Sequence, residues 1–260
     1  MACHRTFSVA LTLLLVLNPA AHATELRVAS SAGFSHAYLA LVPEFEKRSG
    51  VHVESVWGPS MGATHDTIPA RLARGEKIDV VIMAASALEK LAHDGKVDEA
   101  SRVVLASAGI GAAVRAGAAK PDISSADALK RALLAARSVA YSDSASGVYI
   151  AHEMLPRLGL AGDLGGKARM IPAEPVGQVV ARGEAELGFQ TMSELLPIPG
   201  IDIVGPLPPE LQRTIAFAAG IVHGAAAPEA AQALIAFLAS PDAAAAIRRS
   251  GMEPIGERAR

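Results

Sequence analysis

Cysteine is almost missing from this sequence: Cys3 is the only one among 260 residues. One cysteine so near the start can form no disulfide within the chain, so a disulfide-stabilised fold and thiol chemistry in the rest of the chain are excluded. Aromatic residues make up only 4%, and 24 Lys and Arg stand against 26 Asp and Glu. Without a basic excess, a nucleic-acid or anionic-lipid partner is not expected. We also expect no metal and no other cofactor.

Long apolar runs are also missing, with one exception at residues 7–17. His4 and Arg5 precede this run, and the small-x-small sequence Ala21-His22-Ala23 follows it. This pattern is typical of a secretory signal peptide and too short for a membrane anchor. We therefore expect residues 1–23 to be cleaved, and the protein to be exported to the periplasm without membrane insertion.

Apolar, strand-like runs alternate with helical patterns in the first part of the chain. The runs LRVAS, VHVESVW and IDVVIMA end at Ser30, Trp57 and Ala84. Between the first two, apolar residues recur at helical spacing, and Pro43 is expected to kink or break that helix. Near-continuous apolar strands alternating with helices predict an α/β fold whose parallel sheet is covered on both faces.

A second series of strands and helices follows a long extended run, RVVLASAGIGAAVRAG, which contains Gly109 and Gly111. Such a run suits a strand that bends and crosses to another part of the molecule. The chain later returns through Pro206 to a final strand and two helices. We therefore expect two lobes: residues 24–105 with 206–260, and residues 106–205.

Three loops that follow expected strands are rich in hydroxyl groups and glycine. They contain Ser30 and Ser31, then Ser60, and then Ser144 and Ser146 before Gly147. In open α/β sheets, ligands bind beyond the carboxyl ends of the strands, where helix N-termini offer N–H groups and a partial positive charge. The three loops together predict a cradle for a small anion, held by neutral donors.

Two further patterns are open to a functional interpretation. Gly58 to Gly62 fits the G-x-S-x-G motif of serine hydrolases, with Asp202 and His223 in the right order, but that motif belongs deeper in a larger sheet than here. His65-Asp66, close to Ser60, is either a solvated pair or a pair that faces the site.

Several blocks of the sequence resemble the periplasmic substrate-binding proteins of ABC transporters, in particular the molybdate-binding branch. They are LRVASSAGF, GPSMGATHDTIPARLARGEKIDVVIMA, SASGVYIAHEMLPRLGL and IPAEPVGQVVARGEAELGF. The resemblance implies the type II fold of these proteins, with two hinge-linked lobes and a ligand cleft between them. It implies an oxyanion ligand, with an ABC transporter permease as a possible partner. We expect a monomer, because the sequence gives no reason for a stable oligomer.

Carried over by position, the resemblance implies that the ligand contacts include Ser31 or Ser30, Ser60, and the loop from Ser144 through Ser146 and Gly147 to Val148. Molybdate binders carry a tyrosine after a later strand, where this chain has Thr191. We add Thr191 to the expected ligand contacts.

The same blocks are similar to the bacterial aconitate isomerases, which resemble secreted members of this fold. Such an enzyme moves a proton across an allylic carbon, which requires an acid or base near the carbon-bound hydrogens and donors for the carboxylates. His65 or His36 could be the base, and Arg71 could add to the donors. Two functions therefore stay open: capture of a small anion, and isomerisation of a tricarboxylate such as aconitate.

Overall fold

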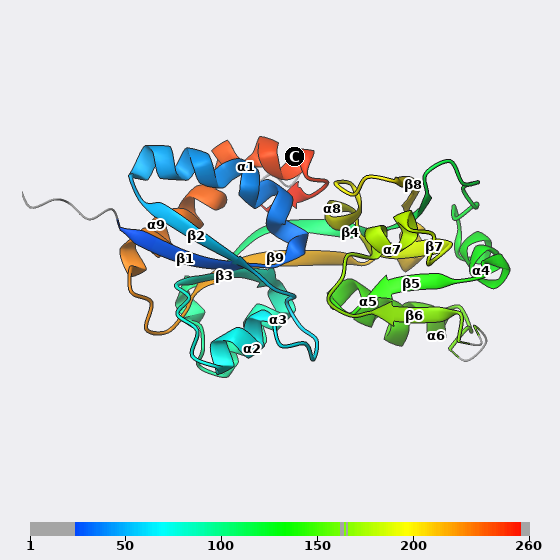
Figure 1. The fold of residues 1–260 in the computed structure, drawn as a ribbon, viewed down its shortest axis with the longest axis horizontal. Helices are drawn as coiled ribbons and strands as arrows, with labels where there is room; N and C mark the ends of the chain where they lie inside the picture. The colour runs from blue at the N-terminus through cyan, green and yellow to red at the C-terminus, as the bar shows by residue number, and fades with distance from the viewer. Residues whose placement is uncertain (1–23, 162–163, 165, 256–260) are drawn as a thin grey trace, which may run out of the picture.

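The computed structural model describes residues 24–161, 164 and 166–255, and their elements form two lobes that lie side by side (Figure 1). The predicted signal peptide lies outside the described residues. Each lobe is a sheet with helices on both faces, which confirms the expected α/β architecture.

The first lobe is built on a sheet in the order β2-β1-β3-β9-β4, and the short strand β10 (Glu253–Pro254) also pairs with β4. Strands β1, β2 and β3 are parallel, and β9, β4 and β10 run antiparallel to the strands they pair with in this sheet. The strands are β1 (Glu25–Ser30), β2 (His52–Trp57), β3 (Val80–Ala84), β4 (Val103–Arg115) and β9 (Thr214–Ile221). All five residues of β3 are buried, because helices cover both faces of the sheet.

One face of this sheet is covered by α1, α9 and α10, and the other by α2 and α3 (Figure 1). The helices are α1 (Ala32–Ser49), α2 (Ile68–Ala73), α3 (Ala85–His93), α9 (Pro228–Leu238) and α10 (Ala244–Arg249). Two separate apolar clusters result, one around Phe34 and Leu234 and one around Ile68 and Met83.

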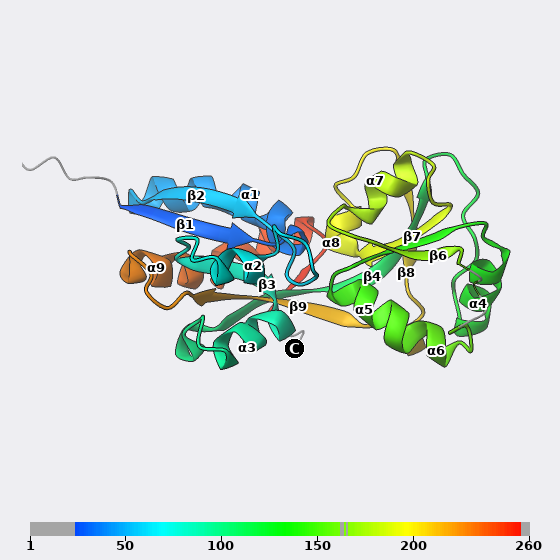
Figure 2. The same ribbon diagram turned by 60° about the horizontal axis from the view of Figure 1, so that its bottom comes forward.

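The second lobe repeats this layered arrangement on a smaller scale (Figure 2). Its strands β5, β6 and β7 are parallel, and β8 pairs antiparallel with β4. The strands are β5 (Val139–Ser142), β6 (Ala168–Ile171), β7 (Leu187–Thr191) and β8 (Ile201–Pro206). The helices are α4 (Ala126–Ala135), α5 (Ala145–Tyr149), a π-helical turn (Ile150–Met154), α6 (Leu155–Arg157), α7 (Val176–Ala181) and α8 (Met192–Leu195). The buried side chains of this lobe form two further clusters, around Leu129 and around Val180.

The long strands β4 and β9 connect the lobes. From Val103 to Gly109, β4 pairs with β9, and from Ile110 onwards it pairs with β7 and β8 of the second lobe. Gln212 lies at the change of partner: its side chain accepts a hydrogen bond from the N–H of Ile110 and donates one to the carbonyl of the same residue. This confirms the expected crossing strand, whereas the lobe boundaries at 105/106 and 205/206 stay a prediction.

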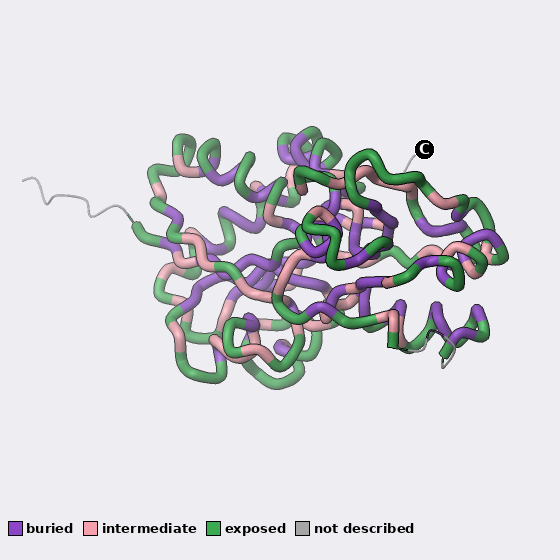
Figure 3. The backbone as a smooth tube through the Cα atoms, turned by 45° about the vertical axis from the view of Figure 1, so that its right-hand side comes forward, coloured by how far each residue is buried: buried purple, intermediate pink, exposed green. Residues whose placement is uncertain are grey.

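Helix α1 runs without a break through Pro43, so of the two expected effects, a kink or a break, the break does not occur. Proline removes one backbone hydrogen bond, that to the carbonyl of Leu39. Both residues are exposed, so water can hydrate that carbonyl. Figure 3 shows the exposed residues in green around the outside of the molecule and the buried ones in purple toward its middle. The helix ends at Gly50, whose positive φ of 72° suits glycine in the left-handed region.

Among the described residues, no single helix is long and apolar enough to cross a membrane. The helical segments 228–238 and 241–249 are together long and apolar enough for a membrane span, but they are bent by 57° against each other. Leu234 and Ile247, one from each part, lie in the core of the first lobe.

Candidate functional site

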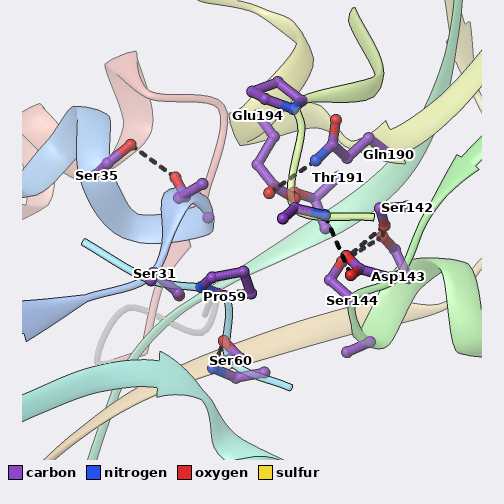
Figure 4. Close-up of a pocket in the computed structure, with 18 of the residues that line it drawn as sticks. Ser31, Ser35, Pro59, Ser60, Ser142, Asp143, Ser144, Gln190, Thr191 and Glu194 are labelled. Carbon is purple, nitrogen blue, oxygen red and sulfur yellow. Dashed lines mark hydrogen bonds between the residues drawn. The ribbon is translucent and has the colours of Figure 1, made fainter. Parts of the chain in front are cut away.

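A cavity of about 520 Å³ lies between the lobes, within the size range of small-molecule sites (Figure 4). Its walls come from the loops after β1, β2 and β3 on one side and after β5, β6 and β7 on the other. The polar residues that line it are Ser31, Ser35, Ser60, Asp66, Ser142, Asp143, Ser144, Ser146, Glu174, Gln190, Thr191 and Glu194. The carboxyl ends of two sets of parallel strands therefore face one space, as the α/β topology favours.

Five helices begin at this cavity, because the residue before each of α1, α3, α5, α7 and α8 is among those that line it. None of these five residues caps its own helix with a side-chain hydrogen bond. Away from the cavity, Thr67 and Ser125 do cap α2 and α4. The helix ends around the cavity thus direct partial positive charge, uncompensated by side-chain caps, toward an anion.

Ser31 stands at the start of the 18-residue helix α1. Its side chain is buried, at 4% exposure, and its Oγ has no hydrogen-bond partner. Since buried hydroxyl groups are nearly always hydrogen-bonded, we expect this one to find its partner in a guest that fills the cavity. Its neighbour Ser30 is fully buried, contacts the carbonyl of Ser31, and is not among the lining residues.

Ser60, in contrast to Ser31, is held in place because its hydroxyl oxygen accepts a hydrogen bond. Its Oγ accepts a hydrogen bond of 2.9 Å from the N–H of Ala84, which ties the loop after β2 to the end of β3. An accepting hydroxyl keeps its own proton, which can be donated to an acceptor in the cavity.

Ser142, Ser144 and Ser146 form a triangle of hydroxyl groups on the second lobe (Figure 4). Their Oγ atoms are 2.7, 3.1 and 3.3 Å apart. All three line the cavity, including Ser142, which the sequence analysis did not select. A triangle of this kind holds three protons and can direct one or more of them at an anion.

Gly147 and Val148, predicted as ligand contacts, are not among the lining residues. Gly147 is needed for packing instead: a Cβ atom there would lie 1.5 Å from the carbonyl oxygen of Ser142. Helix α5 therefore packs directly on the end of β5. The side chain of Val148 is 39% exposed, on a different side of the same helix.

Thr191 lines the cavity together with Gln190 and Glu194, neither of which the sequence analysis selected. The Thr191 hydroxyl donates to Glu194 Oε2 at 2.6 Å, and Gln190 Nε2 donates to Glu194 Oε1 at 2.9 Å (Figure 4). Gln190 also accepts from the N–H of Val176, so these side chains join the starts of α7 and α8. The T-x-x-E spacing of a helix N-terminus was the available signal for Glu194.

The lining residues include four carboxyl groups but no Lys, Arg or His. Two of the carboxylates have cationic partners outside the cavity: Asp66 lies 3.7 Å from Arg71, and Glu174 lies 2.6 Å from Arg182. Among the described residues, no cluster of His, Cys, Asp or Glu is arranged to hold a metal ion. An anionic guest must therefore be held by hydroxyl groups and backbone N–H groups.

The structure does not bring the two predicted histidines to the cavity. His36 lies on the exposed side of α1, and the His65 side chain is 75% exposed and contacts Asp66 at 3.2 Å. Arg71 is engaged by Glu76 and the carbonyl of Trp57. The residues of the alternative hydrolase pattern, Asp202 and His223, do not line the cavity either.

The chain belongs to the bacterial extracellular solute-binding proteins, because the model of that family matches residues 26–253. An aconitate isomerase of Pseudomonas sp. is 51% identical to this chain over 247 residues, which are 95% of this chain and 93% of that protein.

Solved structures of the same architecture confirm the type II periplasmic binding fold. The periplasmic molybdate-binding protein of Azotobacter vinelandii matches with a TM-score of 0.68 and 23% identity, over 87% of this chain and 98% of that one. The sulfate-binding protein of Mycobacterium tuberculosis matches with a TM-score of 0.71 and 20% identity, over 90% and 88%. At these identities the likeness concerns the fold alone.

Proposed function

We propose that this protein is an isomerase that interconverts cis- and trans-aconitate in the cavity between its lobes. The observation that carries this proposal is the 51% identity, along 95% of the chain, to an aconitate isomerase. The reaction moves one proton between two carbons of a tricarboxylate and moves the double bond with it.

The cavity suits a tricarboxylate in three respects. Its volume of about 520 Å³ admits a guest much larger than a tetrahedral oxyanion. Its hydroxyl groups come in separated sets, at Ser31, at Ser60 and at the triangle Ser142–Ser144–Ser146, so several carboxylates can each meet a donor. Such fixed donors also stabilise the negative charge that develops when a C–H bond next to a carboxylate is broken.

A second candidate function is capture of the same kind of anion without turnover, on behalf of an ABC transporter permease. The family match over residues 26–253 supports this candidate. Both functions need the same lobes and cavity. For both we propose export to the periplasm after cleavage of residues 1–23, and action as a monomer.

The test is incubation of the purified protein with cis-aconitate, followed by proton NMR for the trans isomer. Appearance of the trans isomer, and approach to the same mixture from either isomer, supports the isomerase. A thermal shift with aconitate but no interconversion supports capture alone. If aconitate, citrate, molybdate and sulfate all leave the melting temperature unchanged, both candidates are refuted.

A further inference from the structure

The proton transfer that the proposed isomerisation requires needs a titratable group in the cavity, and neither predicted histidine is there. The four carboxyl groups that line the cavity differ in their partners. Asp66 and Glu174 are near Arg71 and Arg182, and Asp143 accepts a backbone N–H from Ala173 at 3.2 Å. Asp143 and Glu194 have only neutral hydrogen-bond partners, and of these two Glu194 is the one whose carboxyl oxygens are both held by a side chain.

Glu194 is also held firmly in place. It stands in the first turn of α8, and both of its carboxyl oxygens accept a hydrogen bond, from Thr191 and from Gln190. Each oxygen has a second lone pair, so the carboxylate can still accept a proton from a guest. The Thr191 hydroxyl is turned toward Glu194 instead of capping α8.

We propose that Glu194 is the catalytic residue that removes and returns the proton of the substrate, an inference that rests on the proposed isomerase function. The Glu194 carboxylate takes a proton from the methylene carbon of aconitate. The electron pair of the broken C–H bond forms the new double bond to the central carbon. The pair of the old double bond then takes the proton back from Glu194 at the former vinyl carbon. One C–H bond is broken and one is formed, with no net oxidation or reduction.

The environment of Glu194 suits this role. Burial raises its pKa above the ordinary value of a glutamate, and the negative charge of Asp143 raises it further, while the hydrogen bonds from Thr191 and Gln190 act in the opposite direction. A carboxylate with a raised pKa is a stronger base, and its conjugate acid still gives the proton back. Among the described residues, Asp143 is the ionised group whose charge reaches Glu194.

The competing interpretation is that Glu194 only completes the start of α8, as a glutamate in the T-x-x-E pattern often does. The two roles predict different kinetics. A purely structural residue affects binding and turnover together through the shape of the cavity. A proton-transferring residue affects kcat while KM stays nearly the same.

The experiment measures isomerisation by NMR and aconitate binding by calorimetry for the wild type, Glu194→Gln, Glu194→Asp and the control Glu153→Gln. Glu153 lies in the same lobe, is exposed, and bonds to Arg213. We expect Glu194→Gln to lower kcat by roughly 100-fold or more with KM within a few-fold of the wild type. Glu194→Asp should retain part of the activity, and Glu153→Gln all of it.

A second readout requires no variant. The acid limb of the kcat/KM profile of the wild type should lie above the ordinary pKa of a glutamate, and Glu194→Asp should move that limb. Two results for Glu194→Gln overturn the inference and leave the isomerase function standing. One is a rate of isomerisation within threefold of the wild type, and the other is a loss of binding and of turnover in equal proportion. A wild type that binds aconitate but never interconverts its isomers ends the proposed function, and the inference with it.

Discussion

Replacement of Ser31 by alanine should have opposite effects on stability and on ligand binding. In the free protein the Ser31 hydroxyl is buried without a partner, so it contributes no hydrogen bond to the fold. In the complex it is expected to donate to a carboxylate. Removal of the hydroxyl therefore takes nothing from the folded state and takes one charge-assisted hydrogen bond from the complex.

The magnitudes follow from these two environments. An unsatisfied buried hydroxyl costs about 1–3 kcal/mol, so Ser31→Ala should unfold no more easily than the wild type. A hydrogen bond to a charged group contributes roughly 1.5–3 kcal/mol, which corresponds to a loss of affinity of roughly 10- to 100-fold.

Ser125→Ala is the matched control, since Ser125 is also the residue before a helix. Its hydroxyl accepts the N–H of Ala128 at 3.2 Å and so caps α4, away from the cavity. This variant should lose about 1 kcal/mol of stability and bind aconitate like the wild type. The assays are urea unfolding without ligand and calorimetric titration with aconitate. Should Ser31→Ala lose stability as Ser125→Ala does and keep its affinity, the hydroxyl is an ordinary cap and the reasoning is refuted.

Three further predictions concern the structure around the cavity and the core. Gly147→Ala should cost about 1–3 kcal/mol in thermal unfolding, because its Cβ would meet the carbonyl of Ser142; an unchanged melting temperature would contradict the close packing of α5. The raised pKa of Glu194 means that the folded state holds its proton more tightly than the unfolded state, so this group's contribution is full below the ordinary glutamate pKa and is lost as pH rises through the raised value. The difference in melting temperature between Glu194→Gln and the wild type should therefore favour the variant more at neutral pH than at acid pH. An equal difference at both pH values would contradict the raised pKa of Glu194. Burial raises the pKa of Tyr38 to about 12, so stability should fall as pH rises from 10 to 12, and an absorbance titration of Tyr38→Phe should lack the last step.

The fold could be predicted closely from the sequence because each strand is apolar and each helix has one apolar face. The crossing strand was visible as an unusually long extended run with Gly109 and Gly111 inside it. The sequence left open whether Pro43 kinks or breaks its helix, since periodicity alone does not show whether the carbonyl that loses its partner is exposed to water. The hydroxyl loops were found because they follow strands, and topology brings strand ends together.

The site was less predictable at the level of single residues, for geometric reasons. Ser30 and Ser31 are neighbours, and adjacent residues at the end of a strand point to opposite sides, so only Ser31 lines the cavity. His36 lies outside the buried face of α1, a position that helical spacing could have excluded. Glu194 was missed because its pattern is shared by many ordinary helix starts, and only its burial at the cavity between the lobes sets it apart.

The two strands that join the lobes have a mechanical consequence. A single connecting strand could twist about its own bonds, but β4 and β9 are tied to each other by the ladder from Val103 to Gly109 and by Gln212. Rotation of one half about the long axis of the molecule would shear that ladder, whereas flexing near Gly109 leaves it whole. We therefore expect the two-stranded connection to resist twisting of one lobe against the other and to allow bending. The two walls of the cavity can then separate and come together again without rotating relative to each other.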